Sequence, residues 1–198
     1  AIYPMLSDAQ LDAYIQRLID QGVGLWDHLA ELELRLHGLR QALEAWTRQR
    51  ISFFDGRRRR RVATQIRRAW RRKTGEGESG DCVLHVVDER VGSLPSLPAD
   101  IDFQHVRRLT LRNLGLEQIR AEFLLRFPQL HELDLRENQL TQLPAGLELL
   151  GQVRDQRLGG NRIALGHRTT ETLGRLPMLE GLDLSGNPLG MMPDLSGL

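Results

Sequence analysis

The chain has 198 residues, of which 40% are hydrophobic and 27% charged, and its formal net charge is +1. These values are typical of a globular protein with a sizeable core, and they argue against a disordered chain. The single cysteine, Cys82, excludes an intrachain disulfide and favours a reducing compartment. No apolar run approaches the ~18 residues that span a bilayer, so we expect a soluble protein without a transmembrane segment.

Both ends of the chain suggest a piece of a longer protein. The chain begins at Ala1 rather than at Met, and it ends inside a repeat pattern, with Leu195 and Leu198 in place for a further unit. We therefore expect the natural protein to continue past Leu198. A signal sequence or a distant catalytic domain would then lie outside this chain.

Two amphipathic helices are predicted at the start of the chain. Residues 7–21 open with the capping pattern Ser7-Asp8-Ala9-Gln10 and continue with apolar residues at helical spacing up to Gly22. Residues 25–48 carry apolar residues that alternate by four and three, ending at Trp46. This stripe needs a helical partner, and in a mixed chain it favours packing in a small helical bundle over a free coiled coil.

A third helix is predicted between Asp55-Gly56 and Thr74-Gly75, and it carries most of the local positive charge. Removing the ten basic residues of 57–73 leaves 17 basic against 26 acidic residues, so the remainder of the chain is acidic. We expect the narrow apolar stripe of this helix to cover the first repeat or the preceding helix as a cap, with the arginines in water. The stripe consists of Val62, Ala63, Ile66, Ala69 and Trp70.

An alternative function for the basic helix is binding to nucleic acid or to an anionic membrane. Ten positive charges on one helix would attract phosphates, and the affinity would fall as salt rises. However, the segment has one aromatic residue, Trp70, which the stripe assigns to packing, and the repeats carry no nucleic-acid motif. The cap is therefore the favoured interpretation, and nucleic acid is the less favoured partner.

From Gly80 onward the sequence is repetitive. The segment LHELDLRENQL, residues 130–140, fits the pattern L-x-x-L-x-L-x-x-N-x-L, and related segments occupy residues 106–116, 153–163 and 179–189. The central strand positions lie 25, 24, 23 and 26 residues apart, which is the period of leucine-rich repeats. These positions are Leu84, Leu109, Leu133, Gln156 and Leu182.

The predicted fold class is α/β. A leucine-rich-repeat solenoid, with short parallel strands on its concave face, follows an N-terminal helical domain. The predicted domains are residues 1–74 (helices, ending in the Arg-rich cap), 75–80 (linker) and 81–198 (repeats, truncated at the C-terminus).

Several positions in the repeats have predicted structural roles. Asn138, Asn161 and Asn187 stand where the chain leaves each strand, and we expect their amides to bond backbone groups that would otherwise be buried unpaired. Glu89 and Leu114 replace Asn in the first two units, which we therefore expect to be less regular. Leucine-proline type pairs, Leu94-Pro95, Leu143-Pro144 and Met192-Pro193, stop each strand. Gln156 takes a leucine position and should point into the core.

The basic helix VATQIRRAWRRK, the lead-in VGSLPSLPADIDFQHVRRLTLRNLGL and the repeat LDLSGNPLG together resemble bacterial leucine-rich-repeat effector proteins. Those proteins end in a novel E3 ubiquitin ligase domain of the IpaH type. The resemblance implies secretion by the type III route into the host cell cytoplasm and repeats that bind a host protein target or contact the C-terminal domain within the same chain. The ligase domain uses a Cys-x-Asp motif, which Cys82-Val83-Leu84 does not match, so the resemblance assigns no catalytic residue here.

The candidate binding residues are those between the repeat leucines, because they project from the concave sheet face where this fold binds partners. They form a charged surface that suits a polar protein partner, although plain solvation would give a similar composition. The candidates are Arg107, Arg108, Thr110, Arg112, His131, Glu132, Asp134, Arg136, Arg154, Asp155, Arg157, Glu180, Asp183 and Ser185.

No catalytic, cofactor or metal site is expected. Cys82 and His85 could be read as a nucleophile and its base, but two nearby strand positions supply no orienting third group. The six histidines have no zinc-ligand spacing, and the glycines of LGGN belong to a repeat rather than to a phosphate-binding loop.

Overall fold

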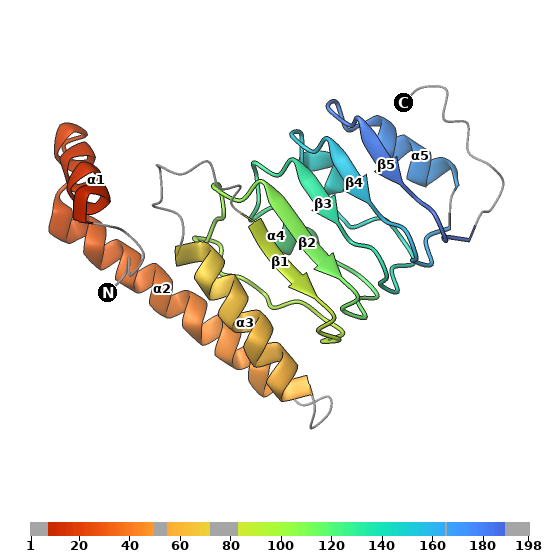
Figure 1. The fold of residues 1–198 in the computed structure, drawn as a ribbon, viewed down its shortest axis with the longest axis horizontal. Coiled ribbons are helices and arrows are strands. Elements are labelled where there is room, and N and C mark those ends of the chain that lie inside the picture. Colours follow the sequence, from red (N-terminus) through yellow and green to blue (C-terminus); the bar gives the residue numbers. More distant parts are fainter. Residues whose placement is uncertain (1–7, 50–54, 72–82, 165, 189–198) are drawn as a thin grey trace.

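The computed structural model describes residues 8–49, 55–71, 83–164 and 166–188. Three helices precede a parallel sheet whose strands follow one another in sequence order, and short helical segments lie on the return side of the repeats (Figure 1). This is the predicted leucine-rich-repeat solenoid. The strands are β1 (Val83–Val87), β2 (Arg108–Arg112), β3 (Glu132–Asp134), β4 (Asp155–Arg157) and β5 (Gly181–Asp183), and the return segments are α4 (Ala121–Leu124), η1 (Leu147–Leu149) and α5 (His167–Gly174).

The strand register confirms the predicted repeat positions. Leu84, Leu109, Leu133, Gln156 and Leu182 are paired successively across the five strands. All but Leu182 are buried. Each unit contributes its central strand side chain to an interior that it shares with the neighbouring units, so the core extends across the units.

Gln156 lies in the core, as predicted. Its side chain is 0% exposed, and neither its Oε1 nor its Nε2 atom has a hydrogen-bond partner among the described residues. An amide buried without partners lowers the stability of the fold. The register that aligns it with Leu133 and Leu182 is therefore maintained in spite of this residue.

The asparagines bond the backbone as predicted. The Asn138 Oδ1 atom accepts hydrogen bonds from the N–H groups of Leu114 and Leu116, at 3.0 and 3.2 Å, and its Nδ2 atom donates to the carbonyls of Leu111 and Leu135. Three of these four partners belong to the preceding repeat. Asn161 and Asn187 make the corresponding contacts one and two units further on.

The expectation that the first two units are less regular is wrong. Strands β1 and β2 have five residues each, whereas β3, β4 and β5 have three. All five units also share a turn residue with positive φ one position before the asparagine column, where three units have residues other than glycine. Backbone pairing therefore preserves the repeat where the asparagine is missing. These turn residues are Asp88, Asn113, Glu137, Gly160 and Gly186.

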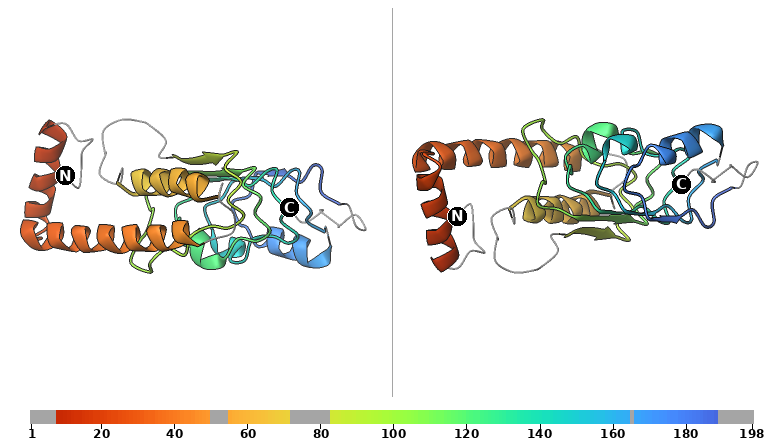
Figure 2. Two further views of the ribbon diagram at one scale, coloured as in Figure 1. Left: turned by 90° about the horizontal axis from the view of Figure 1, so that it is seen from below. Right: turned by 90° about the horizontal axis from the view of Figure 1, so that it is seen from above.

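The three N-terminal helices are α1 (Asp8–Asp20), α2 (Leu25–Arg48) and α3 (Asp55–Arg71). The boundaries of α2 are those predicted, whereas α3 already includes Asp55 and Gly56, which were expected to precede it. Ser7 of the predicted capping pattern lies outside the described residues. Figure 2 shows α2 on the same side of the molecule as α4 and α5, and α3 on the side of the strands.

Helix α3 covers the first repeat and also packs on α2. Its stripe residues Val62, Ile66 and Trp70 are buried in the same core as Leu84 and Val86 of β1. This contact confirms the predicted cap, because the apolar flank of the first repeat would otherwise face water. The helical domain boundaries stay a prediction, and the proposed linker at 75–80 lies outside the described residues.

The expectation that the α3 arginines all lie in water is wrong for Arg59. This side chain is 0% exposed. Its guanidinium donates hydrogen bonds to the carbonyls of Trp46 and Gln49, at 2.9 and 3.2 Å, and to the Ser93 hydroxyl at 3.1 Å. Arg59 therefore joins the end of α2, α3 and the loop after β1, because its donors satisfy backbone carbonyls that a helix end leaves open.

Candidate partner-binding face

Two rows of polar side chains cross the sheet between the buried leucines. In the first row, neighbouring strands place Arg108 beside Glu132, Glu132 beside Asp155, and Asp155 beside Gly181 of β5. Because side chains alternate along a strand, the row lies on the face opposite the core. The second row consists of Thr110, Asp134, Arg157 and Asp183.

The candidates that precede the strands play a different part. The Arg107 carbonyl accepts hydrogen bonds from the N–H groups of His131 and Glu132. In the next unit the His131 carbonyl accepts from Arg154 and Asp155, and in the one after that the Arg154 carbonyl accepts from Glu180 and Gly181. The Arg107 guanidinium donates to the Gln129 side chain at 2.9 Å. These four positions therefore extend the backbone ladder at the entrance to the strands.

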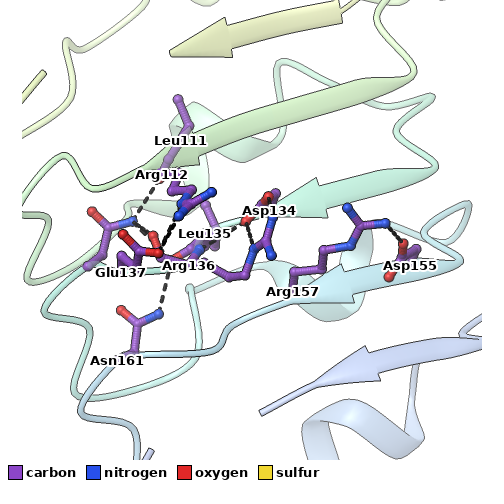
Figure 3. A network of polar contacts seen from close by, with 10 residues as sticks. Leu111, Arg112, Asp134, Leu135, Arg136, Glu137, Asp155, Arg157 and Asn161 are labelled. Carbon is purple, nitrogen blue, oxygen red and sulfur yellow. Dashed lines mark hydrogen bonds and ion pairs between the residues drawn. The ribbon is translucent and has the colours of Figure 1, made fainter. Parts of the chain in front are cut away.

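At the exit from the strands, the side chains are held by ion pairs. Arg112 bonds Glu137 of the next unit, with 2.5 Å between Nη2 and Oε1. Arg136 donates hydrogen bonds from Nε and Nη2 to the two carboxylate oxygens of Asp134, at 3.0 and 2.6 Å. Arg157 donates to the Asp155 carboxylate at 2.5 Å (Figure 3). The charges of these three arginines are therefore paired within the face.

Two carboxylates of the second row have lowered pKa values. Burial alone would raise the pKa of Asp134, but hydrogen bonds from the Arg136 side chain and backbone, with the positive charges of Arg136 and Arg157, hold it below its ordinary value. Hydrogen bonds from the Ser185 hydroxyl and N–H lower the pKa of Asp183, and the same two arginines add to this. At the centre of the face, the positive charges of Arg136 and Arg157 thus stabilise the ionised forms of both Asp134 and Asp183.

The face is shallow between β2, β3 and β4. The depression between β2, β3 and β4 has a volume of about 30 Å³, comparable to the share of one water molecule in the liquid. Near β5, glycines replace side chains, and a Cβ atom on Gly159 would lie 2.9 Å from carboxylate and hydroxyl oxygens of Asp183 and Ser185. The surface is therefore shallow and suits contact with another macromolecule better than enclosure of a small ligand.

The sequence analysis missed the contribution of β1 to this face. Val83, His85 and Val87 pair with Arg108, Thr110 and Arg112, so they begin the same rows. Their alternation with Leu84 and Val86 is visible in the sequence and would have identified them. Cys82, the other member of the considered Cys82 and His85 pair, lies outside the described residues, as do Met192, Pro193, Leu195 and Leu198.

Two arginines of the basic helix α3 are engaged by the rest of the protein. Within the run 57–61, Arg59 is buried, and Arg61 bonds Glu89 of the first turn, with 2.7 Å between Nη2 and Oε2. The hydrogen bond and charge of Glu89 raise the pKa of Arg61. Part of the run therefore serves to attach α3 to the repeats.

A metal-ligand cluster and a membrane-spanning helix are both absent from the described residues. No three His, Cys, Asp or Glu side chains of this part of the chain are grouped so that they could hold a metal ion. None of its helices has both the length and the apolar character that crossing a membrane requires.

The repeats with their parallel strands have the leucine-rich-repeat fold. A family model described as Leucine Rich Repeat matches residues 129–150, which contain β3 and the turn of Asn138. Human vasorin is 39% identical over 118 residues, covering 58% of this chain but 17% of vasorin. The chain thus spans a small part of the curated relatives that it matches.

Among solved structures, the leucine-rich-repeat domain of the type III effector XopL is similar over 99% of this chain and 83% of its own, with 17% identity and a TM-score of 0.46. YopM from Yersinia enterocolitica is similar over 79% of this chain and 35% of its own, with 19% identity and a TM-score of 0.42.

Proposed function

We propose that the concave face of β1–β5 binds a protein partner. The observation that carries this proposal is the second polar row, Thr110, Asp134, Arg157 and Asp183, held in register by the strands. Asp134 is held by Arg136 and Arg157 by Asp155, so these side chains need little rearrangement when a polar partner docks, and the entropic cost of binding is low.

A site-specific cross-linker tests this face. A photoreactive residue in place of Thr110 should capture a partner in extracts of the host, whereas the same residue in place of exposed Glu122 on α4 should not. Thr110→Arg, which adds bulk and charge beside Asp134 in the row, should prevent binding of the purified partner. Equal capture from the two positions would contradict binding at the concave face.

We further propose that the parent protein is a secreted bacterial effector with E3 ubiquitin ligase activity, and that the repeats select its target. This proposal rests on the resemblance of the basic helix, its lead-in and the repeats to such effectors. The sequence of the gene beyond Leu198 tests it directly, since it should encode further repeats and a Cys-x-Asp domain.

Ubiquitin transfer separates the parent from this chain. With a conjugating enzyme, the parent should form a thioester with ubiquitin that is lost when the cysteine of its Cys-x-Asp motif becomes alanine. The 198-residue chain should form none. A thioester on Cys82 would show instead that this chain is itself an enzyme.

A further inference from the structure

A groove between α2 and α3 combines an apolar floor with a basic rim. It has a volume of about 300 Å³. Leu43 and Ala63 form the floor, and Arg40, Arg60 and Arg67 form the rim. We call this surface the α2–α3 groove.

The rim arginines carry charge that is not compensated locally. In the part of the chain that the structure describes, the side chains of Arg40, Arg60 and Arg67 make no ion pair or hydrogen bond. Glu44, the acidic residue of the lining, is 3.1 Å from Arg48 and so has its own partner. The groove therefore favours an occupant that is acidic and has an apolar face.

Helix α1 of the same chain has a face of this kind. Leu11, Ile15 and Ile19 are spaced by four residues and so share one side of the helix, where Leu11 is 39% and Ile19 59% exposed. Asp8 and Asp12 lie beside them on the helix and are exposed. We call this the outer face of α1.

Most of the outer face of α1 is exposed, because the contact with α2 is made by residues at the edge of this face, next to Leu11 and Ile15. Leu18 is buried, and the Tyr14 hydroxyl is 2.5 Å from His28 Nε2 on α2. Figure 2 shows α1 crossing the N-terminal end of α2. The groove begins at Arg40, about 22 Å along α2 from Leu25 at a rise of 1.5 Å per residue. Residues 21–24 connect α1 at the opposite end of α2, and none of the α1 residues lines the groove of its own molecule, which leaves the groove open to α1 of another molecule.

We propose that the chain self-associates, with the outer face of α1 from one copy packed into the α2–α3 groove of another. Leu11 and Ile19 then cover the apolar floor, and Asp8 and Asp12 approach the rim arginines. One helix in one groove is a small contact, so the association is weak and sensitive to salt. Duplex DNA or a lipid headgroup surface would use the arginines but would leave the apolar floor unused.

Complementary charge reversal tests this contact. Sedimentation equilibrium of the full chain at low salt, over protein concentrations on the order of 10–200 µM, should show self-association. Arg60→Glu with Arg67→Glu in one variant, and Asp8→Arg with Asp12→Arg in another, should each weaken it at least about tenfold, because like charges then meet. An equimolar mixture of the two variants should restore association, since both contacts regain opposite charges.

The control is a second pair of arginines on the same helix. Arg57 and Arg68 are exposed and do not line the groove, so Arg57→Glu with Arg68→Glu should leave association unchanged. The proposal fails if the wild-type chain stays monomeric over the whole range, if the control pair has the same effect, or if the mixture stays monomeric. It also fails if the groove variant loses affinity for a DNA duplex or for phosphatidylserine vesicles while its self-association is unchanged.

Discussion

The guanidinium of Arg59 lies over the indole ring of Trp46, with its central carbon 5.0 Å from the ring centroid. In the same position it bonds the Trp46 carbonyl at 2.9 Å. The carbonyl dipoles of Trp46, Gln49 and Val91, together with the indole ring, stabilise this buried cation. Arg59 is thus part of the structural connection between the helices and the repeats.

Arg59→Met should lower the free energy of unfolding by about 2–4 kcal/mol, because several buried carbonyls lose their donor. Urea unfolding followed by circular dichroism measures this. Arg60→Met, one residue along the helix and exposed, should change stability by less than about 0.5 kcal/mol. Equal effects of the two substitutions would mean that Arg59 does not connect the elements.

Trp70→Ala should destabilise the fold by about 3–5 kcal/mol, because the indole ring is 3% exposed and its removal leaves a cavity under the first repeat. Thermal unfolding should remain cooperative and shift to lower temperature. Trp26 offers a matched control: it is 81% exposed, so Trp26→Ala should leave the melting temperature nearly unchanged.

Gln156→Leu should raise the melting temperature by a few degrees. The substitution replaces an unpaired buried amide, which costs about 1–3 kcal/mol, by the residue that the repeat prefers at this position. Differential scanning calorimetry checks the shift. Gln152→Leu, at an exposed position four residues earlier, should produce no comparable gain. A fall in melting temperature for Gln156→Leu would contradict the strand register.

Asn138→Ala should cost about 2–4 kcal/mol, because it leaves the N–H groups of Leu114 and Leu116 and the carbonyl of Leu111 without their partner. Native-state hydrogen exchange should show faster exchange at the amides of Leu114 and Leu116. Unchanged exchange at these two amides would show that water satisfies them equally well.

The lowered pKa of Asp134 predicts a defined loss of stability in acid. The folded state holds the ionised carboxylate more firmly than the unfolded chain, where the pKa is about 3.9. Its contribution is therefore complete above about pH 4–5 and is lost as the pH falls through the lower pKa of the folded state. Asp134→Asn should be less stable than wild type at pH 7, and the difference should shrink toward about pH 2. A difference that stays constant with pH would contradict this interpretation.

The fold could be predicted from the sequence because each structural rule is repeated. The spacing of Leu84, Leu109, Leu133 and Leu182 fixes the strand register even where Gln156 breaks the pattern. The boundaries of α2 follow from its leucine stripe in the same way.

The burial of Arg59 could not be predicted, since its acceptors come from Trp46, Gln49 and a loop more than 30 residues away. The binding face was predictable as a set of positions. Its ion pairs were not, because Arg112 bonds Glu137 of the next unit while Arg136 bonds Asp134 of its own. Which partner an arginine takes depends on rotamers and on the turn that each unit adopts.

The asparagine column gives the solenoid a direction. Each asparagine accepts a hydrogen bond from a backbone N–H of the preceding repeat: Asn138 from Leu114, Asn161 from Leu140 and Asn187 from Ile163. Removal of the β5 coil takes the Asn187 acceptor from Ile163, and removal of a leading coil takes the backbone partners from the next asparagine, so these bonds are lost equally from either end. Under mechanical load, the end covered by α3 should nevertheless open last, because the first repeat also buries Val62, Ile66 and Trp70.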